Sequence, residues 1–200
     1  MNIEVRSLEE KELTEQLKKR TDPEAKRLLR FLNMPDLSRQ AGNPITELVK
    51  RILKIPRFAD FDDIKVPEIV PADVSFDLFN FPPDHPARSK SDTYFIDDNN
   101  ILRPHTTVMW YYWLDQPAIK QKIKNKESIG ALSYGKVYRK DEIDRNHMNV
   151  FHQMDGWYLT PKSQKIIAID DLKEILVEIA RAIYGADIKY RFNKDEFPYT

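Results

Sequence analysis

A guanidinium, a carboxamide and a carboxylate lie on two neighbouring segments of this chain of 200 residues. Arg139 ends an apolar segment, 128–139, and Gln153 and Asp155 belong to the next one, 149–159. The two segments predict a β-hairpin, because both are rich in β-branched and aromatic residues. Strand side chains alternate, so Gln153 and Asp155 share one face about 7 Å apart, where an amide and a carboxylate can surround an ammonium group.

Asp141 continues the face of Arg139 beyond the end of the first strand. A guanidinium and two carboxyl groups on one face of a hairpin suit a zwitterionic or phosphate-bearing ligand. The alternative interpretation is a surface ladder of ion pairs across the hairpin, and spacing alone favours that ladder.

The histidines and the absent cysteines argue against a metal centre. His147 and His152 are five residues apart, His85 and His105 are isolated, and no pair has the i, i+4 spacing of a helical metal site. A chain without cysteine has no disulfide, no thiolate zinc site and no cysteine nucleophile. We therefore expect no metal ligand within this chain.

Glycine is too scarce for a phosphate-binding loop made of backbone. The chain has 5 glycines and no G-x-G-x-x-G. Residues 130–136 match the start of a Walker A loop, but Val137 follows where Ser or Thr is required, and the segment predicts a strand rather than a helix start. If this protein binds a nucleotide, side chains must hold it.

Composition bounds the class of protein. A hydrophobic content of 41% supports one sizeable core, and a mean hydropathy of −0.61 argues against an integral membrane protein. The first residues lack the basic-then-apolar pattern of a signal peptide, so we expect a cytoplasmic location. The 32 basic residues balance the 32 acidic ones, which argues against a non-specific nucleic-acid coat and still allows a local basic patch.

Periodicity and capping residues predict an α+β fold: an antiparallel sheet flanked by helices. We expect a helical appendage over residues 1–42 and a compact domain over 43–200. Expected helices begin near residues 8, 23, 44, 106, 117 and 170. Expected strands cover 64–70, 93–96, 100–103, 128–139, 149–159, 165–169 and 187–192.

Five motifs along the chain resemble, in order, those of the phenylalanyl-tRNA synthetase α-subunit family. They are Asn43-Pro-Ile-Thr, Asp84-His-Pro-Ala-Arg with Asp92-Thr-Tyr-Phe, Leu102-Arg-Pro-His-Thr-Thr, Gly135-Lys-Val-Tyr-Arg-Lys-Asp-Glu-Ile-Asp with Phe151-His-Gln-Met-Asp-Gly, and Phe197-Pro-Tyr-Thr. The resemblance covers about residues 43–200. It implies the class II synthetase fold, with the first class motif over 43–70 at a subunit interface and the second over 135–156.

The resemblance also implies a function. A protein of this family activates phenylalanine with ATP and Mg2+ and transfers it to tRNA(Phe). It works with a β subunit and associates with itself through the first motif. In this family side chains hold the bent ATP, which agrees with the glycine count.

Roles follow by position from the same resemblance. Arg139 is expected to hold the α-phosphate of ATP and the amino-acid carboxylate, and so to be the catalytic residue. Asp141 lies beside it as its acidic partner, and His147 would approach the distal phosphates. The phenylalanine site is expected to comprise His105, Thr107, Gln153, Asp155, Phe197 and Tyr199.

This chain departs from the family pattern at several positions. It has Thr107 where Ser is usual, Asp155 where Glu is usual, and Tyr199 where Phe is usual. It stops at Thr200, before the third class motif, so we expect an incomplete domain, a C-terminally truncated catalytic core. Two other hypotheses remain: a catalytically silent synthetase-like module that binds RNA or a protein, and an unrelated α+β binding domain.

Overall fold

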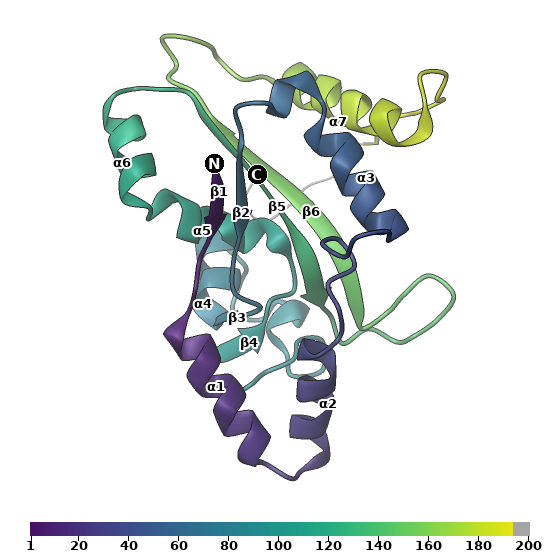
Figure 1. Ribbon diagram of the computed structural model, residues 1–200. Coiled ribbons are helices and arrows are strands. Elements are labelled where there is room, and N and C mark those ends of the chain that lie inside the picture. Colours follow the sequence, from purple (N-terminus) through teal and green to yellow (C-terminus); the bar gives the residue numbers. More distant parts are fainter. Residues whose placement is uncertain (194–200) are drawn as a thin grey trace.

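The fold combines helices with one four-stranded and one two-stranded sheet (Figure 1). The computed structural model describes residues 1–193. The larger sheet has the order β1-β2-β5-β6 and contains β1 (Asn2–Glu4), β2 (Asp62–Lys65), β5 (Ile129–Tyr138) and β6 (Val150–Leu159). The smaller sheet pairs β3 (Ile69–Pro71) with β4 (Asn100–Leu102) in antiparallel register. The predicted α+β class is confirmed.

The larger sheet is mixed rather than wholly antiparallel. β5 and β6 form the predicted antiparallel hairpin over ten residue pairs, whereas β1 with β2 and β2 with β5 are parallel. Parallel neighbours need a long crossover, and helices supply one in both cases. Sequence patterns predicted β5, β6 and their pairing, but not the parallel neighbours on the other side of β5.

Residues 1–193 contain seven α-helices, six between strands and one after β6, and most begin where capping residues predict. They are α1 (Leu8–Lys19), α2 (Pro23–Leu32), α3 (Pro44–Leu53), α4 (Ala72–Ser75), α5 (Met109–Leu114), α6 (Pro117–Lys124) and α7 (Ile169–Tyr184). The side chains of Ser7, Asp22 and Asn43 accept hydrogen bonds from backbone N–H groups in the first turns of α1, α2 and α3. No helix among the described residues is long and apolar enough to cross a membrane.

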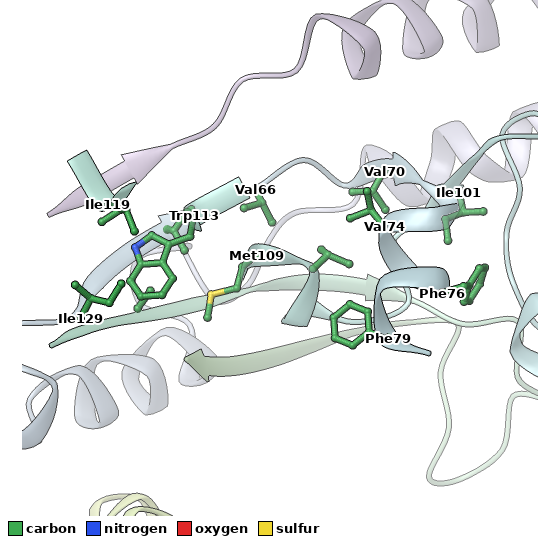
Figure 2. Close-up of a cluster of buried hydrophobic side chains, with 13 residues drawn as sticks. Val66, Val70, Val74, Phe76, Phe79, Ile101, Met109, Trp113, Ile119 and Ile129 are labelled. Atoms are coloured by element: carbon green, nitrogen blue, oxygen red, sulfur yellow. The ribbon is translucent and has the colours of Figure 1, made fainter. Parts of the chain in front are cut away.

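Each face of the β5–β6 hairpin has its own helical cover. On one side, which we call the front face, Trp113 of α5 and Ile119 of α6 pack with Ile129 and Trp157 in the largest buried cluster. Figure 2 shows Trp113, Ile119 and Ile129 close together in that cluster. On the back face, residues of α3 and α7 pack with Leu132 and Met154. The front face therefore carries α5 and α6, and the back face carries α3 and α7.

Two predicted strands, 64–70 and 93–96, differ in the structure. Pro67 divides the first, and the second forms only one bridge. The expected strand 64–70 is two strands, β2 and β3, which break at 66–68, where Pro67 cannot donate to a ladder. Segment 93–96 makes one isolated bridge, Phe95 with Ile101, and β4 pairs with β3 instead.

The expected strands 165–169 and 187–192 do not form. Ile166 and Ile169 are exposed, and α7 already starts at Ile169, where Asp171 accepts a hydrogen bond from the Ala168 N–H. An apolar alternation makes a strand only when a neighbouring strand takes up its hydrogen bonds. Neither segment pairs with another strand within residues 1–193.

The first residues join the large sheet, which the sequence did not predict. β1 pairs with β2 through Asn2 with Asp63 and Ile3 with Ile64. α1 and α2 pack in a buried cluster with Tyr94 and Tyr138. The proposed boundary between residues 42 and 43 stays a prediction, and the segments on either side of it share a sheet and a core.

Arg103 links the two sheets and is only 2% exposed. Its Nε donates to the Lys136 carbonyl of β5 at 2.9 Å, and its Nη1 donates to the Val66 and Pro67 carbonyls at 2.9 and 3.3 Å. The break at Pro67 leaves the Val66 and Pro67 carbonyls without strand partners, and the Arg103 guanidinium provides their hydrogen-bond donor.

Replacement of Arg103 by methionine is expected to lower the free energy of unfolding by about 3–5 kcal/mol, since three buried carbonyls lose their donor. Urea unfolding monitored by tryptophan fluorescence measures this loss. The matched control is Arg57→Met, because Arg57 forms an exposed pair with Glu178 that is worth less than about 1 kcal/mol. A loss below about 1 kcal/mol for Arg103→Met would contradict the bridging role.

Candidate functional site

The hairpin register places Gln153 and Asp155 opposite small residues. Gly135 pairs with Gln153, and Ser133 pairs with Asp155, on the front face. A side chain at Gly135 would meet the Arg103 Nη2 atom at 2.7 Å, so the strand needs glycine there. These small residues leave room for another segment of chain to lie against the hairpin.

That segment is 104–107, which connects β4 to α5. Gln153 Oε1 accepts from the Thr106 N–H at 3.0 Å. Asp155 Oδ2 accepts from the hydroxyls of Thr106 and Thr107 at 2.9 and 2.8 Å. Among residues 1–193, the Asp155 Oδ1 atom and the Gln153 Nε2 atom have no hydrogen-bond partner, so both remain available to a ligand.

The environment of Asp155 disfavours its charge. Burial raises the pKa of Asp155 above its ordinary value, and the hydrogen bonds from Thr107 and Thr106 offset only part of this rise. A partly buried carboxylate with one unused oxygen is well suited to a cationic group, because the pair would compensate for the lost solvation of the carboxylate.

Arg139 reaches the same segment from the end of β5. Its Nε donates to the Pro104 carbonyl at 3.1 Å, and its guanidinium carbon lies 5.2 Å from the centre of the Phe151 ring. Both contacts orient the guanidinium. Its Nη1 and Nη2 groups donate to no other described residue, and the side chain is exposed. An oriented, unpaired guanidinium is a site for a carboxylate or a phosphate.

His105, within this segment, has a neutral ring that points toward Ser75 and Phe79. Its Nε2 is 3.4 Å from the Ser75 carbonyl oxygen, and its ring packs edge-on against the Phe79 ring, with the two ring centres 4.9 Å apart. Burial lowers the pKa of His105 to about 4, so the imidazole carries no charge near neutral pH. Its Nδ1 is buried and has no partner among the described residues. His105 can therefore orient the segment or accept one hydrogen bond, but it adds no positive charge.

The other predicted residues lie apart from this group. Asp141 and His147 belong to the exposed loop between the strands, where His147 pairs with Asp144 at 2.9 Å. That hydrogen bond raises the pKa of His147. No ion pair or hydrogen bond within residues 1–193 joins Asp141 or His147 to Arg139, Gln153 or Asp155 through side chains. Phe197 and Tyr199 lie outside the described residues.

The structure thus brings together five of the predicted residues: His105, Thr107, Arg139, Gln153 and Asp155. It adds Thr106, which sequence reasoning missed although its backbone and hydroxyl both contact the hairpin. The only sequence feature that could have indicated Thr106 was its position next to Thr107. The alternation of side chains along a strand does not predict the contacts of an irregular segment that crosses the strand. No group of three or more His, Cys, Asp or Glu side chains within residues 1–193 could hold a metal ion.

A family model described as "tRNA synthetases class II core domain (F)" matches residues 31–200. The chain belongs to this class II synthetase core family. The phenylalanine–tRNA ligase alpha subunit of Persephonella marina is 34% identical over 193 residues, which are 95% of this chain and 52% of that protein. The alpha subunit of Malacoplasma penetrans is 33% identical over 171 residues, or 84% of this chain and 47% of that protein.

The chain thus spans about half the length of the relatives it matches. Among solved structures, pyrrolysyl-tRNA synthetase from Desulfitobacterium hafniense has a TM-score of 0.54 and 20% sequence identity, and the match covers 86% of this chain and 54% of that one. This likeness confirms the class II fold and carries no argument about the substrate.

Replacement of Asp155 by asparagine is expected to keep or raise the stability of this class II core at pH 7. Because the pKa of Asp155 is raised in the folded state, the unfolded chain loses this proton first as the pH rises above the ordinary value of 3.8. Ionisation of Asp155 therefore removes stability as the pH increases through that window, and asparagine, which still accepts from Thr106 and Thr107, avoids the loss. Urea unfolding from pH 3.5 to 7 measures the difference.

Asp36→Asn is the matched control with the opposite sign. Burial disfavours the charge of Asp36, but contact with His152 and hydrogen bonds from Ser38 outweigh burial and lower its pKa to about 2. Its contribution to stability is present above pH 3.8 and is lost as the pH falls, so asparagine should destabilise the protein at pH 7. If Asp155→Asn destabilises at pH 7 as Asp36→Asn does, our assignment for Asp155 is wrong.

Proposed function

We propose that this chain carries the amino-acid-activating site of a phenylalanine–tRNA ligase. The ligase condenses phenylalanine with ATP to the aminoacyl-adenylate and then transfers the aminoacyl group to tRNA(Phe). The observation that supports the proposal is the convergence of Arg139, Gln153 and Asp155 on segment 104–107 of a class II core.

The free atoms of these side chains match the three polar parts of the substrates. Asp155 Oδ1, together with the second lone pair of Gln153 Oε1, which already accepts from the Thr106 N–H, would receive the ammonium group of phenylalanine. The Nη groups of Arg139 would bind the carboxylate and the α-phosphate, where negative charge gathers as a carboxylate oxygen attacks phosphorus. Adenylation then depends on positioning and charge stabilisation, and no residue has to form a covalent intermediate.

The surroundings of Asp155 favour a ligand with a protonated amino group over a neutral ligand. A neutral ligand would cover the partly buried carboxylate without giving it a counter-charge, whereas an ammonium group pairs with it. Thr106 and Thr107 fix one carboxylate oxygen and leave the other free, which sets the direction from which the ammonium approaches. Phe197 and Tyr199 are proposed to wall the phenyl ring.

The remaining roles concern ATP, its metal and the partners. Asp141 and His147 are proposed to meet the phosphates from the exposed loop, and ATP supplies the activated phosphorus. Mg2+ would arrive bound to the phosphates, since the described residues offer no metal cluster. We also propose a β-subunit partner, self-association through 43–70, and a cytoplasmic location.

Phenylalanine-dependent exchange of pyrophosphate into ATP tests the proposal, on the chain alone and mixed with a phenylalanine–tRNA ligase β subunit. Replacement of Arg139 by alanine should lower the exchange rate by about 10²–10³, as for other donors that stabilise transition-state charge. Arg139→Lys should recover only part of the rate, because lysine lacks the bidentate geometry. Arg57→Ala on the back face is the control and should change the rate less than twofold.

Exchange that depends on tyrosine instead of phenylalanine would contradict the proposed specificity. A loss below about fivefold for Arg139→Ala, equivalent to about 1 kcal/mol, would remove Arg139 from this role. No exchange under either condition would leave the alternative function, a catalytically silent module that binds RNA or protein.

A further inference from the structure

Four lysines gather at the end of the hairpin farthest from Arg139. Lys122 and Lys124 lie in the last turn of α6, Lys126 follows the helix, and Lys162 lies in the connection from β6 to α7. We call this group the lysine patch. In Figure 1 both connections, from α6 to β5 and from β6 to α7, lie at the same end of the sheet.

Hydrogen bonds fix the two parts of the lysine patch to each other. Ser128 Oγ, next to α6, lies 2.7 Å from Thr160 Oγ1 and donates to Gln164 Oε1 at 2.7 Å. Gln164 Nε2 in turn donates to the Lys126 carbonyl at 3.2 Å. The lysines of both segments are therefore held at one end of the hairpin rather than on separate mobile tails.

The charges of the lysine patch are not neutralised. Some lysines elsewhere pair with acids one turn away, as in Lys18 with Glu15, Lys50 with Glu47 and Lys173 with Asp170. Others, such as Lys19 and Lys54, form no ion pair with a described residue but are not grouped with further lysines in this way. None of the four patch lysines forms an ion pair with a described residue, and Glu127 is the only acid between residues 117 and 128. Cations also favour a helix C-terminus, but this effect explains Lys122 and Lys124 only, since Lys126 and Lys162 lie beyond α6.

The lysine patch lies at the end of the face that carries the candidate site. α6 covers the front face through Ile119, and Gln153 and Asp155 lie on that same face. Asp155 precedes Leu159, the last residue of β6, by four positions, or about 13 Å along the strand. A nucleic-acid strand whose end lies at Asp155 and which leaves along β6 would cross the lysine patch within a few nucleotides.

We propose that the lysine patch binds the phosphate backbone of RNA, next to the end of the strand that enters the site. That the ligand is RNA rests on the proposed function, and the position and charge of the surface do not. Lysines without neighbouring acids bind phosphates independently of sequence. A lipid surface fits less well, because α6 buries Ile119 in the core and exposes only one large apolar side chain, Ile123, which is too little to insert.

The test uses the whole chain and a fluorescein-labelled RNA hairpin with a single-stranded CCA end, titrated by anisotropy at 50–200 mM KCl. Replacement of the four patch lysines by glutamine should weaken binding at least tenfold at 50 mM KCl and reduce the salt slope by about 3, since four phosphate contacts are lost. The control replaces four exposed lysines elsewhere by glutamine, Lys11, Lys19, Lys26 and Lys54, and should stay within twofold. Thermal unfolding verifies that both variants fold.

Binding within twofold of the unchanged protein, an equal loss in the control, or no RNA binding by the unchanged protein would overturn the proposal. Binding to vesicles of phosphatidylserine without binding to the hairpin would overturn it as well. The proposed function fails separately: the patch variant should keep full phenylalanine-dependent exchange, and Arg139→Ala should keep the patch-dependent RNA binding. Loss of exchange in the unchanged protein with RNA binding intact would contradict the ligase activity alone.

Discussion

The hydrogen bonding of segment 103–107 to the β5–β6 hairpin is the constraint on which this structure depends. The backbone carbonyl and the guanidinium of Arg103 join β5, while Thr106 and Thr107 donate to Gln153 and Asp155 on β6. An irregular segment with no sheet partner must satisfy its polar groups in some other way. Here side chains of the hairpin perform that task, so the same side chains support the fold and form the site.

This double use determines how the charges are placed. Arg103 is buried and donates to three backbone carbonyls, whereas Arg139 at the strand end is exposed and has free Nη groups. Asp155 is held by one oxygen only, at a cost that burial imposes on its charge. A purely structural residue at this position would not need to be ionisable. The carboxylate is therefore the feature that most clearly points to a cationic ligand.

Sequence reasoning predicted the helices that begin near residues 8, 23 and 44, the long hairpin, and the shared face of Gln153 and Asp155, because these follow from local periodicity and capping. It failed at β1 and at the strands expected over 165–169 and 187–192, since pairing partners distant in sequence decide those segments. It also missed Thr106, whose role depends on a tertiary crossing. The resemblance of the motifs identified the family, and the class II core match confirms it.

A crystal structure of this chain with a non-hydrolysable phenylalanyl-adenylate analogue tests the central claim most directly. The account predicts the ammonium group within hydrogen-bond distance of Asp155 Oδ1 and Gln153 Oε1, and the phosphoryl mimic on the Nη groups of Arg139, with the bonds from Thr106 and Thr107 intact. An analogue bound on another face of the sheet, or an ammonium group that makes no contact with Asp155, would contradict it.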